Sequence, residues 1–385
     1  MYKKLMRITL CLALMYSLPT QADEWSFEYR LFTQFLFGIR NLEDDSIINA
    51  DNLLELPEQN LELDFRPDFS LSNNRFLFSI KPRAELFRTK VELTEDNTET
   101  SSDSDFFLQE WLARAQITDN FSVSYGRENL QWGPALLLSS SNPFLEVNGR
   151  NSPQSEVGGM DYARLVWVAS DAWATSFIVN TDDGRQDFVD HTTSYAIKLD
   201  YTGQEHYFSI IPSLREESDD SDDVVALGFF GGANINNALL AYVEGSLVKD
   251  GDSTQGLAGL SYTLNGGSNL ILEYYYQQDG CTNDLIHTCL APGAIPGNLE
   301  RTRLLRKEYL FLNASKDWDQ RRTTLSLRLI HNLNDDSNRL IAHFTRAMGD
   351  HWSGFVVGAV TSGDENTEFG SLVKSSLEAG FELTF

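Results

Sequence analysis

The chain has 385 residues and a formal net charge of −26, from 30 Lys and Arg against 56 Asp and Glu. Hydrophobic residues make up 42%, which excludes a disordered acidic chain, and the acidic balance argues against nucleic acid as a partner because phosphate binding requires a basic surface. After the N-terminus, no stretch approaches the roughly 20 apolar residues of a membrane-spanning helix. A soluble β protein or a membrane β-barrel remains.

Residues 1–22 have the pattern of an export signal. A basic start is followed by an apolar stretch at residues 8–18, and a small-residue cleavage site ends at Ala22. The alternative, a retained anchor, is disfavoured because the apolar stretch is too short to span a membrane. We expect residues 23–385 to form one mature domain.

Apolar and polar residues alternate along the start of this domain. Between residues 25 and 40, one face of the chain is apolar and the other is polar. The apolar face carries Trp25, Phe27, Tyr29, Leu31, Phe35, Phe37 and Ile39, and the polar face carries Glu28, Arg30, Gln34 and Arg40. The same period of two recurs at 61–71 and 76–86. Because successive side chains of a strand point to opposite faces, this alternation predicts β-strands.

Short turns alternate with longer connections along the chain, which is typical of outer-membrane barrels. The pattern predicts an all-β fold, a transmembrane antiparallel up-and-down β-barrel of about eighteen strands, with sixteen as the alternative because two strands are short. An even count places both termini on the periplasmic side. The predicted strands are 24–40, 59–71, 74–89, 105–118, 120–128, 159–169, 172–180, 193–202, 204–214, 223–234, 236–248, 254–265, 267–278, 303–314, 318–331, 337–348, 350–361 and 372–385.

If the apolar faces contact lipid, the charged faces line the lumen. Arg or Lys facing the bilayer midplane would cost about 2–4 kcal/mol, so an inward orientation is favoured. The charges then either attract anionic solutes or neutralise one another in a lattice that only keeps the lumen wet; the sequence leaves both open. The predicted pore-lining residues are Arg30, Arg40, Glu62, Asp64, Arg66, Arg75, Lys81, Arg83 and Arg114.

The third long connection, residues 129–158, is the longest and carries apolar residues. Such a loop needs a surface to pack on. We expect it either to fold inward and constrict the pore or to pack on the barrel rim. Arg127, Trp132 and Arg150 are the candidate constriction residues.

Residues of this region resemble a motif of the capsule-assembly Wzi-like barrels, namely Gly126-Arg127, Trp132-Gly133-Pro134, Leu136 to Leu138, and Ser141-Asn142-Pro143. The resemblance implies an eighteen-stranded outer-membrane protein that holds capsular polysaccharide at the cell surface. The chain departs from that family because its first strand starts within a few residues of Asp23, which leaves no room for the family's periplasmic helical segment. General and substrate-specific porins resemble the chain equally well in architecture.

Two cysteines, Cys281 and Cys289, remain after the export signal. In an exported protein, an even pair in one connection predicts a disulfide. A metal site is disfavoured because His287 alone does not complete a zinc-binding pattern. We therefore expect no metal and no cofactor.

The chain ends in an alternating apolar strand that stops at Phe385. Phe381, Leu383 and Phe385 resemble the C-terminal signature of bacterial outer-membrane proteins, which the barrel-assembly machinery reads. An ordinary edge strand is the alternative, but a soluble protein rarely leaves so apolar an edge unprotected.

These patterns favour a Gram-negative outer-membrane, porin-like channel for passive diffusion of small hydrophilic solutes, with anionic solutes as the candidate class. The alternative is a Wzi-like surface protein that anchors acidic polysaccharide. We expect no enzyme, because the six His residues form no catalytic motif. The expected partners are outer-membrane lipid, lipopolysaccharide, the assembly machinery and the solute or polysaccharide. The oligomeric state stays open.

Overall fold

The computed structural model describes residues 24–43, 45–94, 97–150, 154–186, 191–216, 223–249, 253–290 and 304–385, without the side chains of residues 93, 94, 97 and 321. The predicted export signal, residues 1–22, lies outside the described residues.

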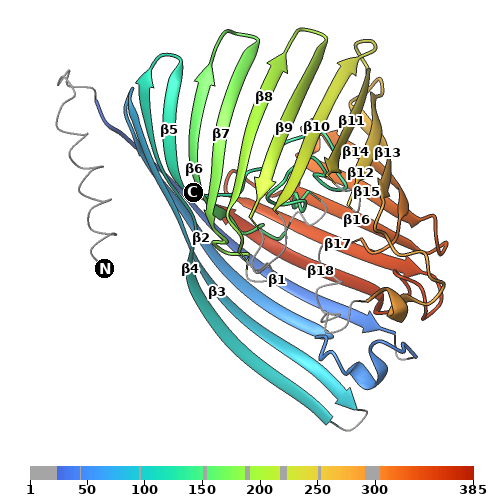
Figure 1. Cartoon of the computed structure of the whole chain (residues 1–385). Helices are drawn as coiled ribbons and strands as arrows, with labels where there is room; N and C mark the ends of the chain where they lie inside the picture. Colours follow the sequence, from blue (N-terminus) through green and yellow to red (C-terminus); the bar gives the residue numbers. More distant parts are fainter. Residues whose placement is uncertain are drawn as a thin grey trace.

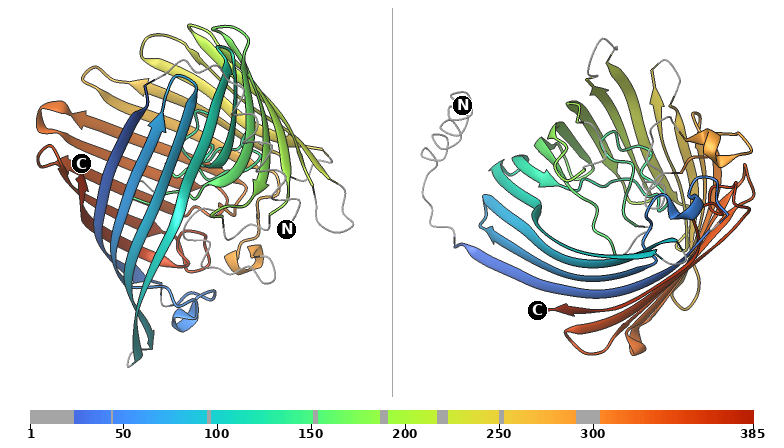
Figure 2. Two further views of the ribbon diagram at one scale, coloured as in Figure 1. Left: turned by 90° about the vertical axis from the view of Figure 1, so that its left-hand side faces the viewer. Right: turned by 90° about the horizontal axis from the view of Figure 1, so that it is seen from below.

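The described residues form one closed sheet of 18 antiparallel strands, in which each strand pairs with its neighbours in the chain and β1 also pairs with β18 (Figures 1 and 2). The predicted fold class and the count of eighteen are confirmed. The strands are β1 (Ser26–Leu42), β2 (Gln59–Ser72), β3 (Phe76–Thr94), β4 (Asn97–Thr118), β5 (Phe121–Glu128), β6 (Met160–Val168), β7 (Trp173–Asp182), β8 (Ser194–Thr202), β9 (His206–Arg215), β10 (Val224–Asn234), β11 (Leu239–Val248), β12 (Gln255–Thr263), β13 (Ser268–Gln277), β14 (Glu308–Trp318), β15 (Thr323–Asn332), β16 (Asn338–Ala347), β17 (Trp352–Ser362) and β18 (Val373–Thr384).

Within the described residues, helix is confined to short 3₁₀ turns, namely η1 (Ala50–Asn52), η2 (Ile286–Cys289) and η4 (Asp319–Arg321). None of the described helices combines the length and the apolar content that a membrane-crossing helix needs.

The predicted strand boundaries differ most at the third hairpin. We expected a connection at residues 90–104, but β3 continues to Thr94 and β4 begins at Asn97. The start of β4, Asn97–Ser104, extends beyond the shorter β5 and carries no apolar residue, so the hydrophobic alternation that marks the other strands is absent there. β14 begins later than predicted, at Glu308 and not at residue 303.

The alternation along each strand separates an apolar outside from a polar inside. Phe35, Leu63 and Ile80 are exposed on the outer surface, whereas Gln34 and Asp64, their chain neighbours, are buried. In a bilayer these exposed apolar residues would contact lipid, and lipid would shield their apolar surface from water. The core of the molecule is therefore the barrel interior.

The last strand closes the barrel against the first. Phe35 lies opposite Phe381 in the β1–β18 ladder, and Leu31 and Phe385 exchange two backbone hydrogen bonds of 2.9 Å. The Phe385 ring stacks on His351 at 4.8 Å between centroids. The C-terminal residues thus complete the wall and leave no exposed edge there, which is how barrels avoid the hazard of unpaired strands.

Candidate functional site

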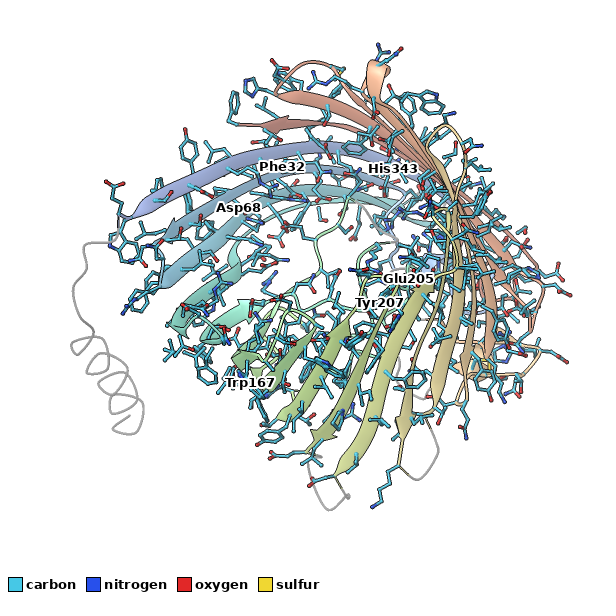
Figure 3. All side chains as sticks on the ribbon, turned by 90° about the horizontal axis from the view of Figure 1, so that it is seen from above. Phe32, Asp68, Trp167, Glu205, Tyr207 and His343 are labelled. Atoms are coloured by element: carbon cyan, nitrogen blue, oxygen red, sulfur yellow. A yellow bond between two sulfur atoms is a disulfide. The ribbon has the colours of Figure 1, made fainter. Side chains whose placement is uncertain are left out.

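Residues 129–150 and 154–158 lie inside the barrel, as Figure 3 shows from above, and their contacts reach both sides of the wall. On the side of β1–β3, Gln34 donates a hydrogen bond to Oε1 of Gln154 at 2.5 Å, and Arg83 binds Glu156. On the side of β11–β13, Glu273 binds the backbone of Leu136. Because β1–β3 and β11–β13 face each other across the barrel, the loop spans the lumen. These contacts correspond to the inward-folding alternative of the sequence prediction.

Two buried glutamates hold the loop on the β11–β13 side. The carboxylate of Glu273, 0% exposed, accepts the backbone N–H of Leu136 at 2.7 Å and of Leu137 at 2.9 Å. The hydroxyl of Tyr242 donates a further bond of 2.6 Å to the same carboxylate. Hydrogen bonds to an ionised group contribute about 1.5–3 kcal/mol each, so Glu273 is a strong anchor.

Glu244, 1% exposed, provides the second anchor. It accepts the backbone N–H of Ala135 at 3.3 Å and both the N–H and the hydroxyl of Ser141, at 3.2 and 2.9 Å. Gly133 approaches the same carboxylate with a φ of +82°, and a Cβ at this position would lie 2.2 Å from Oε2 of Glu244. Only glycine combines this backbone conformation with such a close approach.

Apolar packing adds to these polar contacts. One cluster joins Leu137 and Leu138 of the loop to inward side chains of β11–β15, among them Tyr275, Tyr309 and Phe311. A second cluster joins loop residues to β6 and β7; its members are Leu130, Met160, Tyr162 and Ile178, with Trp132 and Phe144 packed against them. The loop therefore supplies part of the core of a barrel that would otherwise enclose water.

Arg83 holds the loop on the opposite side of the lumen. Its guanidinium, 1% exposed, binds both oxygens of Glu156 at 2.5 and 2.9 Å and one oxygen of Asp68 at 3.1 Å. It also donates to the carbonyl oxygens of Pro67 and Pro82. Removing one partner of a buried ion pair costs about 3–5 kcal/mol, which makes Arg83 a structural link between wall and loop.

Most of the predicted pore-lining charges lie on the inner face and pair locally. Arg66 binds Asp64 and donates to the side chain of Gln34 at 2.8 Å, and Lys81 pairs with Glu110 at 2.6 Å. These pairs favour the neutralising lattice over a row of arginines that face a solute. The further inner-face ion pairs are Arg30–Asp68, Arg164–Glu128 and Lys198–Asp200.

Arg30, Glu62 and Arg114 also fall on the predicted face. Arg30 lies near the start of β1, where its side chain is 60% exposed. Glu62 neighbours Asp64, and Arg114 acts electrostatically on Glu128. Arg75 lies in the turn before β3, so the strand predicted at 74–89 begins later, at Phe76. The polar Asn73 ends the alternation there, and its side chain caps the backbone N–H of Arg75 at 2.9 Å.

Of the constriction candidates, Arg127 is wrong. It lies in β5, shares the outward face of Tyr125, and pairs with Asp161 of β6 at 2.7 Å. Because the alternation of β5 continues through Arg127, its side chain points away from the lumen. Its charge is paired with Asp161 on the neighbouring strand. Trp132 and Arg150 do lie in the loop within the barrel.

Trp132 and Arg150 stabilise the loop. The Trp132 ring packs edge-on against Phe144 at 6.0 Å, and Nζ of Lys198 lies 5.7 Å from its centre. Arg150 donates to the carbonyl of Ala135 at 2.5 Å, and Arg328 of β15 donates to the carbonyl of Arg150 at 2.6 Å. Their contacts are thus with the protein itself.

A cavity of about 260 Å³ remains between the loop and the wall formed by β16–β18 and β1. Its apolar side includes Leu137, Ile330 and Phe369, and its polar side includes Arg40 and Arg339. Arg40 is therefore the predicted pore-lining residue that faces this remaining space. A volume of this size is slightly below the usual range of ligand pockets.

The connections above this cavity form a buried polar network. Cys281 and Cys289 are joined by a disulfide, which confirms the predicted pair. Arg306 pairs with Asp335 at 3.0 Å, and Glu368 accepts hydrogen bonds from Tyr309 at 2.5 Å and from the backbone of Leu305 at 2.9 Å. Desolvation raises the pKa of Glu368 from 4.5 to about 7. These connections are thus fixed to one another.

Glu244, Glu273 and Glu368 are not among the residues predicted from the sequence. Glu244 and Glu273 are single acids in otherwise apolar or aromatic strands, Tyr242-Val243-Glu244 and Leu272-Glu273-Tyr274, and that isolation is the signal that could have found them. Among the described residues, no group of three or more His, Cys, Asp or Glu side chains is placed to hold a metal ion.

No protein-family model and no curated protein matches the chain. Among solved structures, it is similar to Wzi, an outer-membrane protein involved in group 1 capsule assembly in Escherichia coli and a carbohydrate-binding β-barrel. The identity is 11%, the match covers 99% of this chain and 87% of Wzi, and the TM-score is 0.58. A triple mutant of Rhodopseudomonas blastica porin matches with 11% identity over 94% of this chain and 100% of its own, with a TM-score of 0.47. The chain has the fold of an outer-membrane β-barrel.

Proposed function

We propose that this protein is an outer-membrane barrel whose own third loop closes the lumen to bulk diffusion, and that it binds a carbohydrate polymer at the cell surface. The observation that carries the proposal is the attachment of residues 129–158 to facing walls, through Arg83 on one side and Glu273 on the other. A loop fixed at both sides of the lumen is suited to filling the barrel.

The charge arrangement supports a closed barrel. Inward arginines and lysines such as Arg66 and Lys81 pair with carboxylates of the same wall, so little of their field is left to attract a passing anion. The fold likeness to Wzi, described as a carbohydrate-binding β-barrel, supports carbohydrate as the ligand class. The role is one of binding, without catalysis, in the outer membrane, where lipid and lipopolysaccharide surround the barrel.

Polymer binding is tested with the purified full-length protein in detergent. Dextran serves as a neutral polymer and polygalacturonate as an acidic one, each titrated by isothermal calorimetry with bovine serum albumin as the negative control. We expect binding of at least one polymer at micromolar to millimolar affinity, typical of weak surface recognition. Binding of neither polymer would overturn the carbohydrate assignment. The protein has a net charge of −26, which disfavours binding of a polyanion. Comparing the affinities for dextran and polygalacturonate measures how much this charge matters.

A narrow channel is the second candidate, and the cavity beside Arg40 and Arg339 favours it. Solutes that pass along this space would meet Arg40 and Arg339 together with Glu368 and Glu378, so the two guanidiniums contribute to the balance of charge along it. The variant Arg40→Gln with Arg339→Gln should then shift the reversal potential in a salt gradient toward cation selectivity. A reversal potential equal to that of the wild type would count against this route.

A further inference from the structure

The long hairpin of β3 and β4 leaves one sheet edge open. β4 pairs with β5 only between Trp111 and Thr118, so among the described residues the part of β4 from Asn97 to Glu110 has no strand on that side. In Figures 1 and 2 this part of the hairpin extends beyond the neighbouring wall. Within the described chain, no backbone hydrogen bond from outside the hairpin reaches Thr98–Phe107.

The other edge of the hairpin is covered. β2 pairs with β3 up to Lys90, the backbone N–H of Glu58 donates to the Lys90 carbonyl at 3.0 Å, and the side chain of Asn52 donates to the Glu92 carbonyl at 3.1 Å. The open edge is therefore specific to β4. It lies at the end of the barrel that carries the long connections.

The open edge is regular and accessible. Every residue from Thr98 to Ser104 is exposed, and all are paired in register with β3 from Glu92 to Leu86, apart from a shift near Glu92 at the tip. Proteins protect such edges with charged side chains, above all lysine, with proline or with a bulge, and here Glu99 and Asp103 are the charged residues that disfavour an apolar or acidic partner. The sequence Thr-Glu-Thr-Ser-Ser-Asp-Ser contains neither proline nor lysine. Its alternate backbone N–H and C=O groups are placed to pair with another extended chain.

The charge of this edge points to a cationic occupant. Glu99 and Asp103 lie on one face of β4, and no Lys or Arg lies between Asn97 and Glu110. Asp105, the next acid on that face, already pairs with Arg185 at 3.3 Å. A second copy of the chain paired antiparallel at this edge would bring like charges together, which is destabilising. A strand with Lys or Arg at alternate positions would place opposite charges beside Glu99 and Asp103.

We propose that Thr98–Ser104 of β4 is a docking edge that accepts an extended, lysine- or arginine-rich segment of a partner protein by β-strand addition. Main-chain hydrogen bonds to the open edge hold the segment, and Glu99 and Asp103 select its charge. The inference goes beyond carbohydrate binding and does not depend on it.

The test uses a fluorescent synthetic octapeptide in which lysine alternates with threonine, added to the full-length barrel in detergent at low salt. Two further peptides carry N-methyl groups on alternate backbone nitrogens, at the odd or at the even positions. Only one of these sets of N–H groups faces a strand partner. We expect the unmethylated peptide and one methylated peptide to bind, and the other to lose at least tenfold in affinity. Hydrogen exchange should slow at Thr98–Ser104 on binding.

The charge selection is tested with Glu99→Gln combined with Asp103→Asn. Loss of two cross-strand charge pairs should weaken peptide binding roughly tenfold. The matched control, Asp119→Asn with Asp171→Asn, removes two acids from exposed turns at the other end of the barrel and should leave the affinity unchanged. Equal binding of both methylated peptides, or no binding of any, would overturn the proposal. Dimerisation through Thr98–Ser104 without peptide binding would assign the edge to a second copy and contradict it.

Discussion

The carboxylate of Glu273, buried in the wall of the barrel on β13, accepts the backbone N–H of Leu137 at 2.9 Å, in the loop that crosses the lumen. A wall carboxylate thus holds the main chain of a long connection without depending on the loop's side chains. The same carboxylate binds Leu136, so its loss would release two backbone groups at once.

Replacing Glu273 with alanine should free this part of the loop. Two hydrogen bonds to a charged acceptor are lost, so the free energy of loop opening should fall by roughly 3–6 kcal/mol. Hydrogen exchange at the amides of Leu136 and Leu137, followed by mass spectrometry, measures the change. The matched control, Glu110→Ala, removes a carboxylate that pairs with Lys81 on the opposite wall and should leave this exchange unchanged. Unchanged exchange in Glu273→Ala would contradict the anchoring role.

Gly133→Ala should displace the loop from Glu244. A positive φ costs a non-glycine residue about 1–2 kcal/mol, and here the new Cβ would also meet the carboxylate at 2.2 Å. Gly266→Ala is the matched control, since Gly266 has a φ of +105° with nothing within 4 Å of an added Cβ. In urea unfolding from lipid vesicles, Gly133→Ala should lower the midpoint more than Gly266→Ala does. Equal midpoints would show that the close approach has no energetic role.

The sequence allowed the strands to be predicted because lipid and lumen impose opposite polarity on alternate residues such as Phe35 and Gln34. The start of β4 escaped prediction because Asn97–Ser104 carries no apolar residue to mark an alternation. Arg127 was misplaced because a charge near the end of a strand can point outward above the lipid, where a neighbouring carboxylate satisfies it.

The sequence predicted two alternative positions for the third loop, inside the lumen or on the barrel rim, and could not decide between them. Its apolar content requires a surface, but that surface is made of residues more than a hundred positions away, such as Glu244 and Glu273. Period-two alternation says which face these glutamates occupy and not what they bind. Arg83 and Glu156 are 73 positions apart, so spacing along the chain could not reveal their pairing.

The connections around Glu368 should loosen as pH rises. Desolvation raises its pKa to about 7 in the folded protein, above the 4.5 of an unfolded chain. The fold therefore favours the protonated form, and this contribution to stability is complete below about pH 4.5 and is lost as pH rises through 7. Hydrogen exchange at Leu305, corrected for its intrinsic pH dependence, should show more frequent opening at pH 8 than at pH 5.5. In Glu368→Gln the corrected opening should no longer change across this range; an unchanged difference would assign it to another group.

Deleting Phe385 should impair assembly of the barrel. The deletion removes two backbone hydrogen bonds to Leu31 and the ring that stacks on His351. Phe385→Leu is the control, because it keeps the backbone bonds and an apolar side chain. The fraction of protein that reaches the heat-resistant folded form on unboiled gels measures assembly, and we expect a large loss for the deletion and a smaller one for Phe385→Leu. Normal insertion of the deletion variant would contradict the role of the terminal residue.

Single-molecule conductance in planar bilayers tests the closed lumen most directly. The wild-type barrel should show no stable current of porin size, because residues 129–158 are fixed to both walls. A variant with Glu244→Ala and Glu273→Ala, which releases the β11–β13 side of the loop, should show large and fluctuating openings. A steady wide-pore conductance in the wild type, equal to that of the double variant, would contradict the account.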